Sequence, residues 1–405
     1  MVRALEGLRV LDLTRFVAGP YVTMALAAMG AEVIKVEAPA GDPYRHQGTA
    51  FVGDEAELFL CLNSGKRSLA IDFRRPEAEA VVARLVESVD VVVQNARPGA
   101  LDRYGLGPDQ VEARNPRAVY ASISGYGELG PQAARGGFDL ILQAEGGVMA
   151  LTGAEGDAPV AIGAPLLDIG AGMSCLSAIL AALLERERTG RGARVSSSLL
   201  EHSLAGMTTL IANHLVSGAL PRAGGSHSPT FAPYGAFRAS DAYFVLAGAG
   251  SEHLWVQLCE VVGRPELVED ARFASNADRV AHRDELVAVL EERFAERTAE
   301  EWVDALEAVG IPAGLVARMD QLLASEQVQA LGTVGSVEHP RVGAYPVAAF
   351  PMRIDGEALI PSAPAPELGG DSRAVLHSLG IADAAIDELV AAGVLVDHGD
   401  GSAAS

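Results

Sequence analysis

The sequence predicts an α/β protein of two domains, and three observations lead to this expectation. At 405 residues the chain is too long for one ordinary hydrophobic core. In its first half, short β-rich segments alternate with segments of helical periodicity, which is typical of βαβ units and a parallel sheet. Beyond residue 233 the order changes to a hairpin followed by helices. We therefore expect a large α/β domain and a smaller α+β domain.

The large domain is expected at residues 1–216, where runs rich in valine, isoleucine and leucine mark the strands. Pro76 suits the first turn of a helix, because a proline there loses no backbone hydrogen bond. Gly190 follows a regular helical pattern and supplies its C-terminal stop. The predicted strands are 8–13, 32–37, 68–72, 89–94, 118–122 and 194–199, and the predicted helices are 20–29, 76–87, 108–113, 169–189 and 200–216.

Two stretches rich in glycine and proline divide the rest of the chain. Residues 217–233 are predicted to be a linker or mobile loop, and residues 234–342 to be the small domain. Residues 343–405 are expected to contain a second connector and a final helical region. Within the small domain, the expected elements are a hairpin at 235–238 and 243–247 and helices near 252–262, 282–292 and 299–308.

Composition and charge exclude several classes of function. The chain has 53 acidic and 31 basic residues, a formal net charge of −22, and would repel nucleic acid phosphates. No uninterrupted apolar run reaches the roughly 18–20 residues that span a bilayer, and the N-terminus lacks an apolar signal core. The three cysteines are scattered without metal-ligand spacing and are expected to be reduced. We therefore expect a cytoplasmic protein that binds neither membrane nor nucleic acid.

One glycine-rich segment matches a dinucleotide-binding fingerprint. Gly125-Tyr-Gly127-Glu-Leu-Gly130 has the required spacing and follows a predicted strand. However, Pro131 comes next, no amphipathic helix follows at once, and the first βα unit lacks the pattern. A bent glycine loop explains the segment better than a nicotinamide site.

Asp168 directly precedes the most regular predicted helix. An aspartate there often caps the helix N-terminus. A second interpretation is also open, because its neighbours are apolar and the carboxylate would lie in a partly dry setting. In that case Gly170 and Gly172 would leave room for a ligand, and the helix N-terminal amides could stabilise an oxyanion. The local sequence alone does not decide between a cap and a functional carboxylate.

Short motifs follow one another over nearly the whole chain. They are LEGLRVLDLT (5–14), AGP (18–20), GAEVIKVE (30–37), NSGKRS (63–68), NARPGALDR (95–103), SGYG (124–127), LLDIGAGM (166–173), TGRG (189–192), YGAF (234–237) and IPAG (311–314). Each motif alone is a weak signal, but the ordered set resembles the class III CoA-transferases, the family of formyl-CoA and carnitine CoA-transferases. The α-methylacyl-CoA racemases are related to this family.

The resemblance implies a particular architecture. The large domain is expected to be Rossmann-like, and the C-terminal helix is expected to return to it through the connector at 343–366. Two chains are expected to thread through each other as interlocked rings in a homodimer. The residue pattern by itself does not indicate this interlocking.

The resemblance also implies a chemistry in which Asp168 is the nucleophile. Its carboxylate would attack an acyl-CoA to give a mixed anhydride, and the released thiolate would return to form an aspartyl-CoA thioester. A free acid would then take the CoA by the reverse steps. A carboxylate with its usual pKa near 4 is ionised at neutral pH, so no base is expected to activate it. Coenzyme A and acyl-CoA are substrates, and no permanently bound cofactor or metal is expected.

Four positions correspond to the family's CoA site. Lys66 and Arg103 match positions that hold the phosphorylated nucleotide end, and cations of these types suit phosphates. Asn95 and Ala96 match the segment that lines the adenosine and pantetheine path.

The acyl end of the site departs from the family in two places. Val17 replaces the glutamine of the formyl-CoA enzyme, which argues against formate or oxalate as substrate. Phe138 replaces the histidine that the racemases use for proton transfer, so a racemase is disfavoured. Asp139 is expected either near the acyl group or merely as a surface cap. Gly224 and Gly225 partly match a glycine-rich lid. A non-catalytic CoA-binding protein is the remaining alternative.

Overall fold

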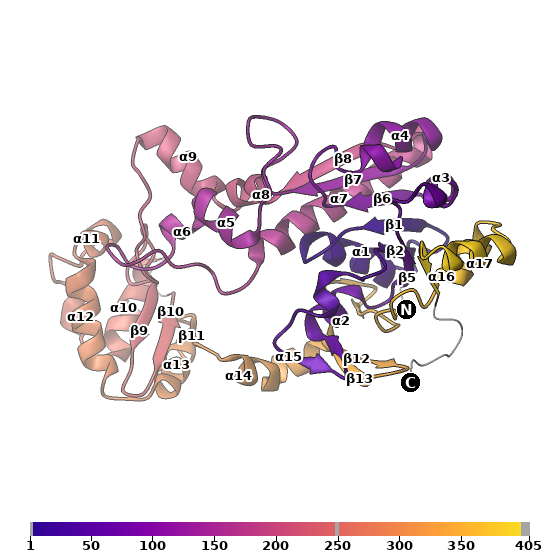
Figure 1. The fold of residues 1–405 in the computed structure, drawn as a ribbon. Helices are drawn as coiled ribbons and strands as arrows, with labels where there is room; N and C mark the ends of the chain where they lie inside the picture. The colour runs from indigo at the N-terminus through magenta and orange to yellow at the C-terminus, as the bar shows by residue number, and fades with distance from the viewer. Residues whose placement is uncertain (1–2, 248–250, 398–405) are drawn as a thin grey trace. The chain divides into compact units, whose positions relative to one another are not determined.

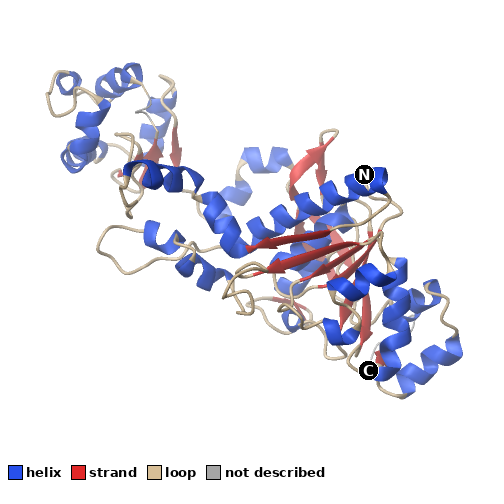
Figure 2. Cartoon of the chain, turned by 90° about the horizontal axis from the view of Figure 1, so that it is seen from above, coloured by secondary structure: helices blue, strands red, loops and turns tan. Residues whose placement is uncertain are grey.

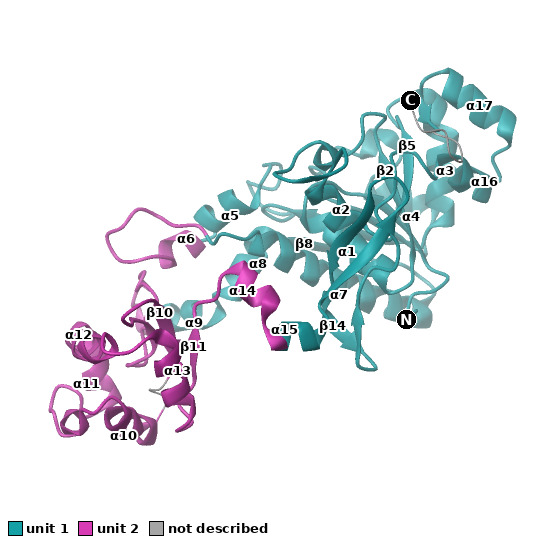
Figure 3. Cartoon of the chain, turned by 90° about the horizontal axis from the view of Figure 1, so that it is seen from below, with its two compact units in different colours: residues 1–147, 162–216, 327–405 teal, residues 148–161, 217–326 magenta. Residues whose placement is uncertain are grey.

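The computed structural model describes residues 3–247 and 251–397 (Figure 1). The chain divides into two compact units (Figure 3). The first unit comprises residues 1–147, 162–216 and 327–405, and the second comprises residues 148–161 and 217–326. The second unit therefore takes a short segment from the predicted large domain, and residues 327–342 belong to the first unit instead of the predicted small domain.

A seven-stranded sheet forms the centre of the first unit, with the order β16-β5-β2-β1-β6-β7-β8. All neighbours are parallel except β16, which is antiparallel to β5. The α/β class predicted from alternating strands and helices is confirmed. The strands are β1 (Arg9–Leu13), β2 (Glu32–Glu37), β5 (Arg67–Ile71), β6 (Val91–Gln94), β7 (Val119–Ser124), β8 (Arg194–Ser198) and β16 (Leu395–Val396).

Helices cover both faces of this sheet (Figure 2). Helices α1 (Ala18–Ala28) and α7 (Leu166–Thr189) pack against each other and against the strands. On the other face, Leu11, Ile34 and Val92 join a buried apolar cluster. The helices of that cluster are α3 (Glu79–Ser88), α4 (Pro108–Arg114), α16 (Ser372–Ser378) and α17 (Asp383–Ala391). Alternating strand side chains thus supply two cores, one for each face.

Helix α7 is long and apolar enough, by length and composition, to cross a membrane. Asp168, Ser174 and Ser177 interrupt its apolar residues, so α7 passes this test by mean hydropathy and not as an uninterrupted apolar run. In the structure its inner side is buried against α1, β7 and β8. The buried Arg186 near its end pairs with Asp90 at 2.9 Å. These contacts are those of a core helix.

Two segments differ from the sequence prediction. Residues 343–366, expected as a connector, instead contain strands, and Tyr345 is buried with its hydroxyl 2.8 Å from Ser64 Oγ. The predicted helix 200–216 is divided after Gly206 into α8 (Leu199–Gly206) and α9 (Thr208–Ser217). The remaining elements of the first unit are α2 (Glu57–Asn63), α5 (Asp139–Glu145), α15 (Glu326–Leu331), β3 (Phe51–Val52), β4 (Glu55–Ala56), β12 (Val334–His339), β13 (Gly343–Ala348), β14 (Phe350–Ile354) and β15 (Glu357–Leu359), with the 3-10 helices η1 (Pro43–Arg45), η2 (Pro76–Ala78) and η3 (Asp102–Tyr104).

The second unit is an antiparallel three-stranded sheet, in the order β11-β10-β9, with helices around an aromatic core. Phe294 is central to this core, with ring contacts to Phe237, Phe244 and Trp302. The predicted hairpin and three helices are present. The elements are β9 (Gly235–Arg238), β10 (Tyr243–Leu246), β11 (Ala313–Leu315), α6 (Val148–Leu151), α10 (Glu252–Val261), α11 (Asn276–Ala281), α12 (Arg283–Phe294), α13 (Ala299–Glu307), α14 (Met319–Ala324) and η4 (Pro265–Val268).

The strand order of the first unit determines where a ligand can bind. Strand β1 lies between β2 and β6, so the connections from these strands diverge at this point. In open α/β sheets such a switch point leaves a crevice outside the carboxyl ends of the strands. The loops that follow β1, β6 and β7 meet there.

Candidate active site

A cavity of about 460 Å³ lies at the carboxyl ends of β1, β6 and β7. Five of the predicted site residues line it, namely Val17, Asn95, Ala96, Phe138 and Asp168. They come from segments far apart in the chain, and the sheet topology brings them together. Arg103 and Lys66 do not line this cavity.

Asp168 is the third residue of α7, not its cap. The N-cap position is Pro165, which has no side-chain cap, and within the described ranges no hydrogen bond to the Asp168 carboxylate is found. The carboxylate is half-buried and faces the cavity. The cap interpretation of Asp168 is therefore wrong.

Asp139 is the residue that caps α7. Its Oδ2 accepts hydrogen bonds from the backbone N–H groups of Leu167, at 2.8 Å, and Asp168, at 3.1 Å. Its Oδ1 accepts a 2.5 Å hydrogen bond from Gln143 Nε2. Asp139 thus caps α7 and not its own helix, and it lies close to Asp168; its predicted place near the acyl group stays a prediction. Our expectation that these helix amides could stabilise an oxyanion is wrong, because Asp139 occupies them.

The environment of Asp168 disfavours its ionised form. Burial raises the pKa of Asp168, and the neighbouring charge of Asp139 raises it further, from 3.8 to about 7. The expectation that this carboxylate ionises at its usual pKa is therefore wrong. Near pH 7 the protonated and ionised forms are both populated.

Gly170 and Gly172 do not leave room for a ligand, contrary to our expectation. A Cβ at Gly170 would lie 1.8 Å from His202 Nε2, because the imidazole packs directly on the helix. A Cβ at Gly172 would lie 3.0 Å from the carbonyl oxygen of Ala18, where α1 crosses α7 closely. Both glycines therefore serve helix packing.

Aromatic rings form one wall of the cavity. The ring of Phe16 contacts the edges of Tyr44 and Phe138, at centroid distances of 5.5 and 5.8 Å. Phe16 has a φ of +67°, a conformation that is costly for a bulky residue and marks functional sites more often than chance. Phe138 is 63% exposed, so this wall is open to solvent.

Arginine side chains make the cavity locally basic. Asn95 joins the loops after β1 and β6, since it accepts from Arg15 N at 3.0 Å and donates to Arg15 O at 2.6 Å. The side chains of Arg15 and Arg97 both line the cavity, and no ion pair to either is found in the described part of the chain. Arg135, by contrast, is paired with Glu145 at 2.8 Å. Two guanidinium groups are thus available to an anionic ligand.

Lys66 is buried away from any ligand. Its Nζ forms an ion pair with Asp12 at 3.0 Å and donates to Asn63 Oδ1 at 2.8 Å and to Pro20 O at 3.1 Å. With its side chain fully buried, it has no access to a phosphate. The prediction that Lys66 binds CoA is therefore corrected to a structural role.

Arg103 is exposed on η3, where its guanidinium lies 4.7 Å from the ring centroid of Tyr104. It is accessible to a ligand that extends beyond the cavity. No structural observation tests its predicted contact with the nucleotide, which stays a prediction.

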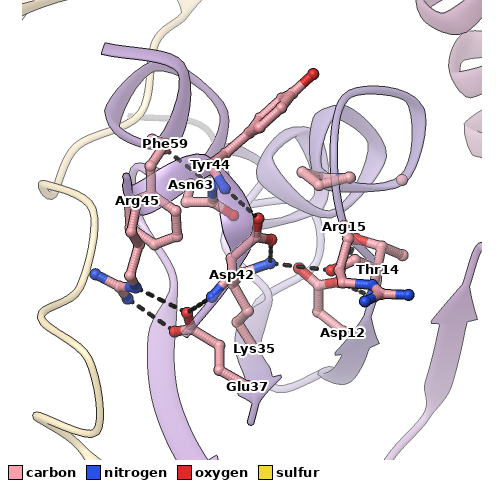
Figure 4. A network of polar contacts seen from close by, with 12 residues as sticks. Asp12, Thr14, Arg15, Lys35, Glu37, Asp42, Tyr44, Arg45, Phe59 and Asn63 are labelled. Carbon is pink, nitrogen blue, oxygen red and sulfur yellow. Dashed lines mark hydrogen bonds and ion pairs between the residues drawn. The ribbon is translucent and has the colours of Figure 1, made fainter. Parts of the chain in front are cut away.

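A buried ionic network supports the two segments that carry Phe16 and Tyr44 (Figure 4). Lys35 Nζ donates to Thr14 O at 3.0 Å and pairs with Asp42 at 2.8 Å. Asp12 accepts from Thr14 N at 2.9 Å, and Arg45 pairs with Glu37 at 2.8 Å. The network therefore fixes the start of the loop that carries Phe16 and the turn that carries Tyr44.

Sequence reasoning missed Tyr44, Phe16 and this network. A signal was present, because Asp12 and Lys35 interrupt apolar strands at positions where side chains are buried. They are also register partners on the adjacent strands β1 and β2. A buried charge in a strand needs a partner, so each predicts an ion pair.

The predicted lid residues lie in the second unit. Gly225 has a φ of +63°, which favours glycine, and its N–H donates to Gly153 O at 2.9 Å. A role for Gly224 and Gly225 in covering Asp168 stays a prediction.

Comparisons with known proteins agree with the motifs described above. A family model described as "CoA-transferase family III" matches residues 5–372. A succinyl-CoA:glutarate CoA-transferase of Mus musculus is 37% identical over 399 residues, covering 98% of this chain and 91% of that protein. A succinate–glutarate CoA-transferase of Agrobacterium fabrum is 34% identical, covering 93% of this chain and 95% of that protein. The crystal structure of a CAIB/BAIF family protein from Brucella suis matches with a TM-score of 0.83 and 36% identity, over 94% of this chain and 100% of that one.

Proposed function

Because the chain belongs to CoA-transferase family III, we propose that it moves coenzyme A from an acyl-CoA to a free carboxylic acid through covalent intermediates on Asp168. The observation that carries this proposal is the Asp168 carboxylate at the wall of the cavity, for which the described residues supply no hydrogen-bonding partner, together with the Arg15 and Arg97 guanidinium groups, for which they supply no ion pair. The carboxylate suits a nucleophile, which needs a free lone pair. The guanidinium groups suit the acyl-CoA substrate, which is anionic at its nucleotide end.

In the proposed mechanism, a carboxylate oxygen of Asp168 attacks the thioester carbon. The C–S bond breaks and CoA leaves as a thiolate, which gives an enzyme–acyl anhydride. The thiolate then attacks the Asp168 carbonyl carbon, forming an aspartyl-CoA thioester and releasing the donor acid. The acceptor acid reverses both steps, so the thioester energy is conserved if water is kept from the anhydride. These steps require neither a metal nor an electron carrier.

A dicarboxylic acid is the substrate class that we propose. Two of the relatives act, by their names, on succinate and glutarate. Arg15 and Arg97 supply positive charge in the cavity of a chain whose net charge is −22. Such guanidinium groups would bind either the CoA phosphates or the second carboxylate of the acid. We also propose a cytoplasmic homodimer with interlocked chains, on the resemblance alone.

The cavity favours a transferase over a racemase of the same family. A racemase needs a second group that exchanges a proton on the opposite side of the α-carbon. Phe138 stands at the position of the racemase histidine, and no described residue that lines the cavity is a histidine. Asp168 thus faces no described histidine of the kind that the racemases use as its acid–base partner.

The proposal predicts that incubation with succinyl-CoA labels Asp168. Hydroxylamine should trap the activated carboxyl group as a hydroxamate, which peptide mass spectrometry would locate. Exchange of labelled succinate into succinyl-CoA should accompany the adduct. Incorporation of solvent deuterium at the α-carbon, without an adduct, would instead indicate a racemase. The absence of both signals would indicate a CoA-binding protein without catalytic activity.

The rate of adduct formation should depend on pH. Only the ionised carboxylate attacks, so the rate should rise about tenfold per pH unit below the pKa of Asp168, about 7, and level off above it. Stopped-flow mixing with succinyl-CoA between pH 5 and 9 would measure this. The Asp139→Asn substitution removes a negative charge that raises this pKa, so it should move the midpoint to lower pH. A rate independent of pH across this range would contradict the protonation argument.

A further inference from the structure

We propose that Tyr44 is a further catalytic residue, whose phenolic O–H donates a hydrogen bond to the acyl carbonyl oxygen while Asp168 attacks. This inference rests on the proposed function, since it concerns the first step of that reaction. The attack forms a bond from a carboxylate oxygen to the carbonyl carbon and moves the π electron pair onto the carbonyl oxygen. The resulting oxyanion needs a donor nearby. When the C–S bond breaks, the pair returns, and Tyr44 keeps its proton throughout.

The first amides of α7 cannot supply this donor. The N–H groups of Leu167 and Asp168 donate to Asp139. The N–H of Leu166 donates to Ala164 O at 2.8 Å, and that of Ile169 to Pro165 O at 3.1 Å. The helix end closest to the nucleophile therefore has no free donor, and the oxyanion must find one elsewhere in the cavity wall.

Tyr44 has a free donor in the same cavity as Asp168. No hydrogen bond to its hydroxyl is found among residues 3–247 and 251–397, although the side chain is half-buried. Both residues line the same cavity. Burial raises the pKa of Tyr44, and the negative charge of Asp168 raises it further. The phenol therefore stays protonated at neutral pH and can donate.

The protein holds this ring in place from several sides. The Tyr44 backbone N–H donates to Asp42 Oδ1 at 2.9 Å, and Asp42 is itself paired with the buried Lys35. The next residue, Arg45, is buried with its guanidinium 3.7 Å from the Phe59 ring centroid. The Phe16 ring packs against Tyr44 at 5.5 Å. Figure 4 shows the Tyr44 ring pointing away from this network, so the turn is rigid while its hydroxyl remains free. A preorganised donor of this kind is what stabilises a developing charge.

The test is Tyr44→Phe, which removes the hydroxyl and keeps the ring. We expect the single-turnover rate of adduct formation from succinyl-CoA to fall about 10- to 100-fold, with KM for succinyl-CoA changed less than about threefold. The hydrogen bond acts in the transition state, so the loss should be in kcat. The matched control is Tyr21→Phe, because Tyr21 is also half-buried, contacts Phe350 at 4.9 Å and does not line the cavity. It should keep the wild-type rate.

The outcomes separate this inference from the function on which it rests. If wild-type protein forms the Asp168 adduct and Tyr44→Phe forms it at the same rate, the role of Tyr44 is overturned and the transferase stands. If wild-type protein forms no adduct with any acyl-CoA, the proposed function fails, and the inference fails with it. A rise in KM with kcat unchanged would make Tyr44 a binding residue and would also overturn the proposal.

Discussion

Asp168→Asn is expected to lose about 10⁴-fold or more of the CoA exchange rate while making the folded protein more stable. The amide is nearly isosteric with the carboxyl group but cannot form the anhydride. Exchange of labelled succinate into succinyl-CoA measures the first effect. Asp168→Ala, which cannot revert by deamidation, should lose the same activity.

The gain in stability follows from the sign of the pKa change. Because folding raises the pKa of Asp168 from 3.8 to about 7, the folded state holds its proton more tightly than the unfolded state. Wild-type stability therefore falls as pH rises through this interval. Asparagine does not titrate, so its advantage should grow from pH 5 to pH 8. A pKa change of this size corresponds to about 4 kcal/mol, and partial solvent exposure should reduce the observed gain to about 1–2 kcal/mol.

Urea unfolding of both proteins at pH 5 and pH 8 would measure this difference. Asp157→Asn is a suitable comparison, since Asp157 is an exposed aspartate that does not line the cavity. It should change stability little at either pH. If Asp168→Asn is less stable than wild type at pH 8, the ionised carboxylate makes a contact that stabilises the folded protein. That result would contradict the view that this carboxylate is kept for catalysis at a cost in stability.

The fold was largely predictable because it depends on periodicity. Segments rich in valine and isoleucine, such as 32–37 and 91–94, are largely buried strands in the structure. The residues 343–366 were misjudged because their prolines and glycines resemble a linker. Yet the strand Gly343–Ala348 buries alternate side chains, among them Tyr345, against the cluster around Phe59. Short edge strands of this kind are defined by tertiary contacts and not by local composition.

The candidate site was only partly predictable. The motif order located Asp168, but its raised pKa depends on burial and then on Asp139, which lies 29 positions earlier in the chain and reaches the start of α7 through the fold. Tyr44 is in no motif that we singled out, and its relevance comes from the cavity. Lys66 was misassigned because a motif identifies a residue type, whereas burial decides what that residue can touch.

Lys66→Met should destabilise the protein by about 3–5 kcal/mol, because it leaves buried Asp12 without its ion-pair partner. The pKa of Asp12 is depressed to about 2, even though burial alone would raise it, since Lys66 and Lys35 both lie close to it. The ion pair is thus what keeps this carboxylate charged inside the protein. Chemical denaturation at pH 7 would measure the loss.

Arg103→Met should have the opposite pattern of effects to Lys66→Met: little change in stability and weaker binding of CoA. Arg103 is exposed and makes no ion pair that the described ranges show, so its loss should change stability by less than about 0.5 kcal/mol. If it holds the CoA phosphates, the affinity for CoA should fall about tenfold, and the salt dependence of binding should weaken. Calorimetric titration of both variants with CoA at two salt concentrations would distinguish the role of Arg103 from that of Lys66. A stable Lys66→Met protein with weakened CoA binding would restore Lys66 as a ligand contact, and would show that the buried ion pair opens when CoA binds.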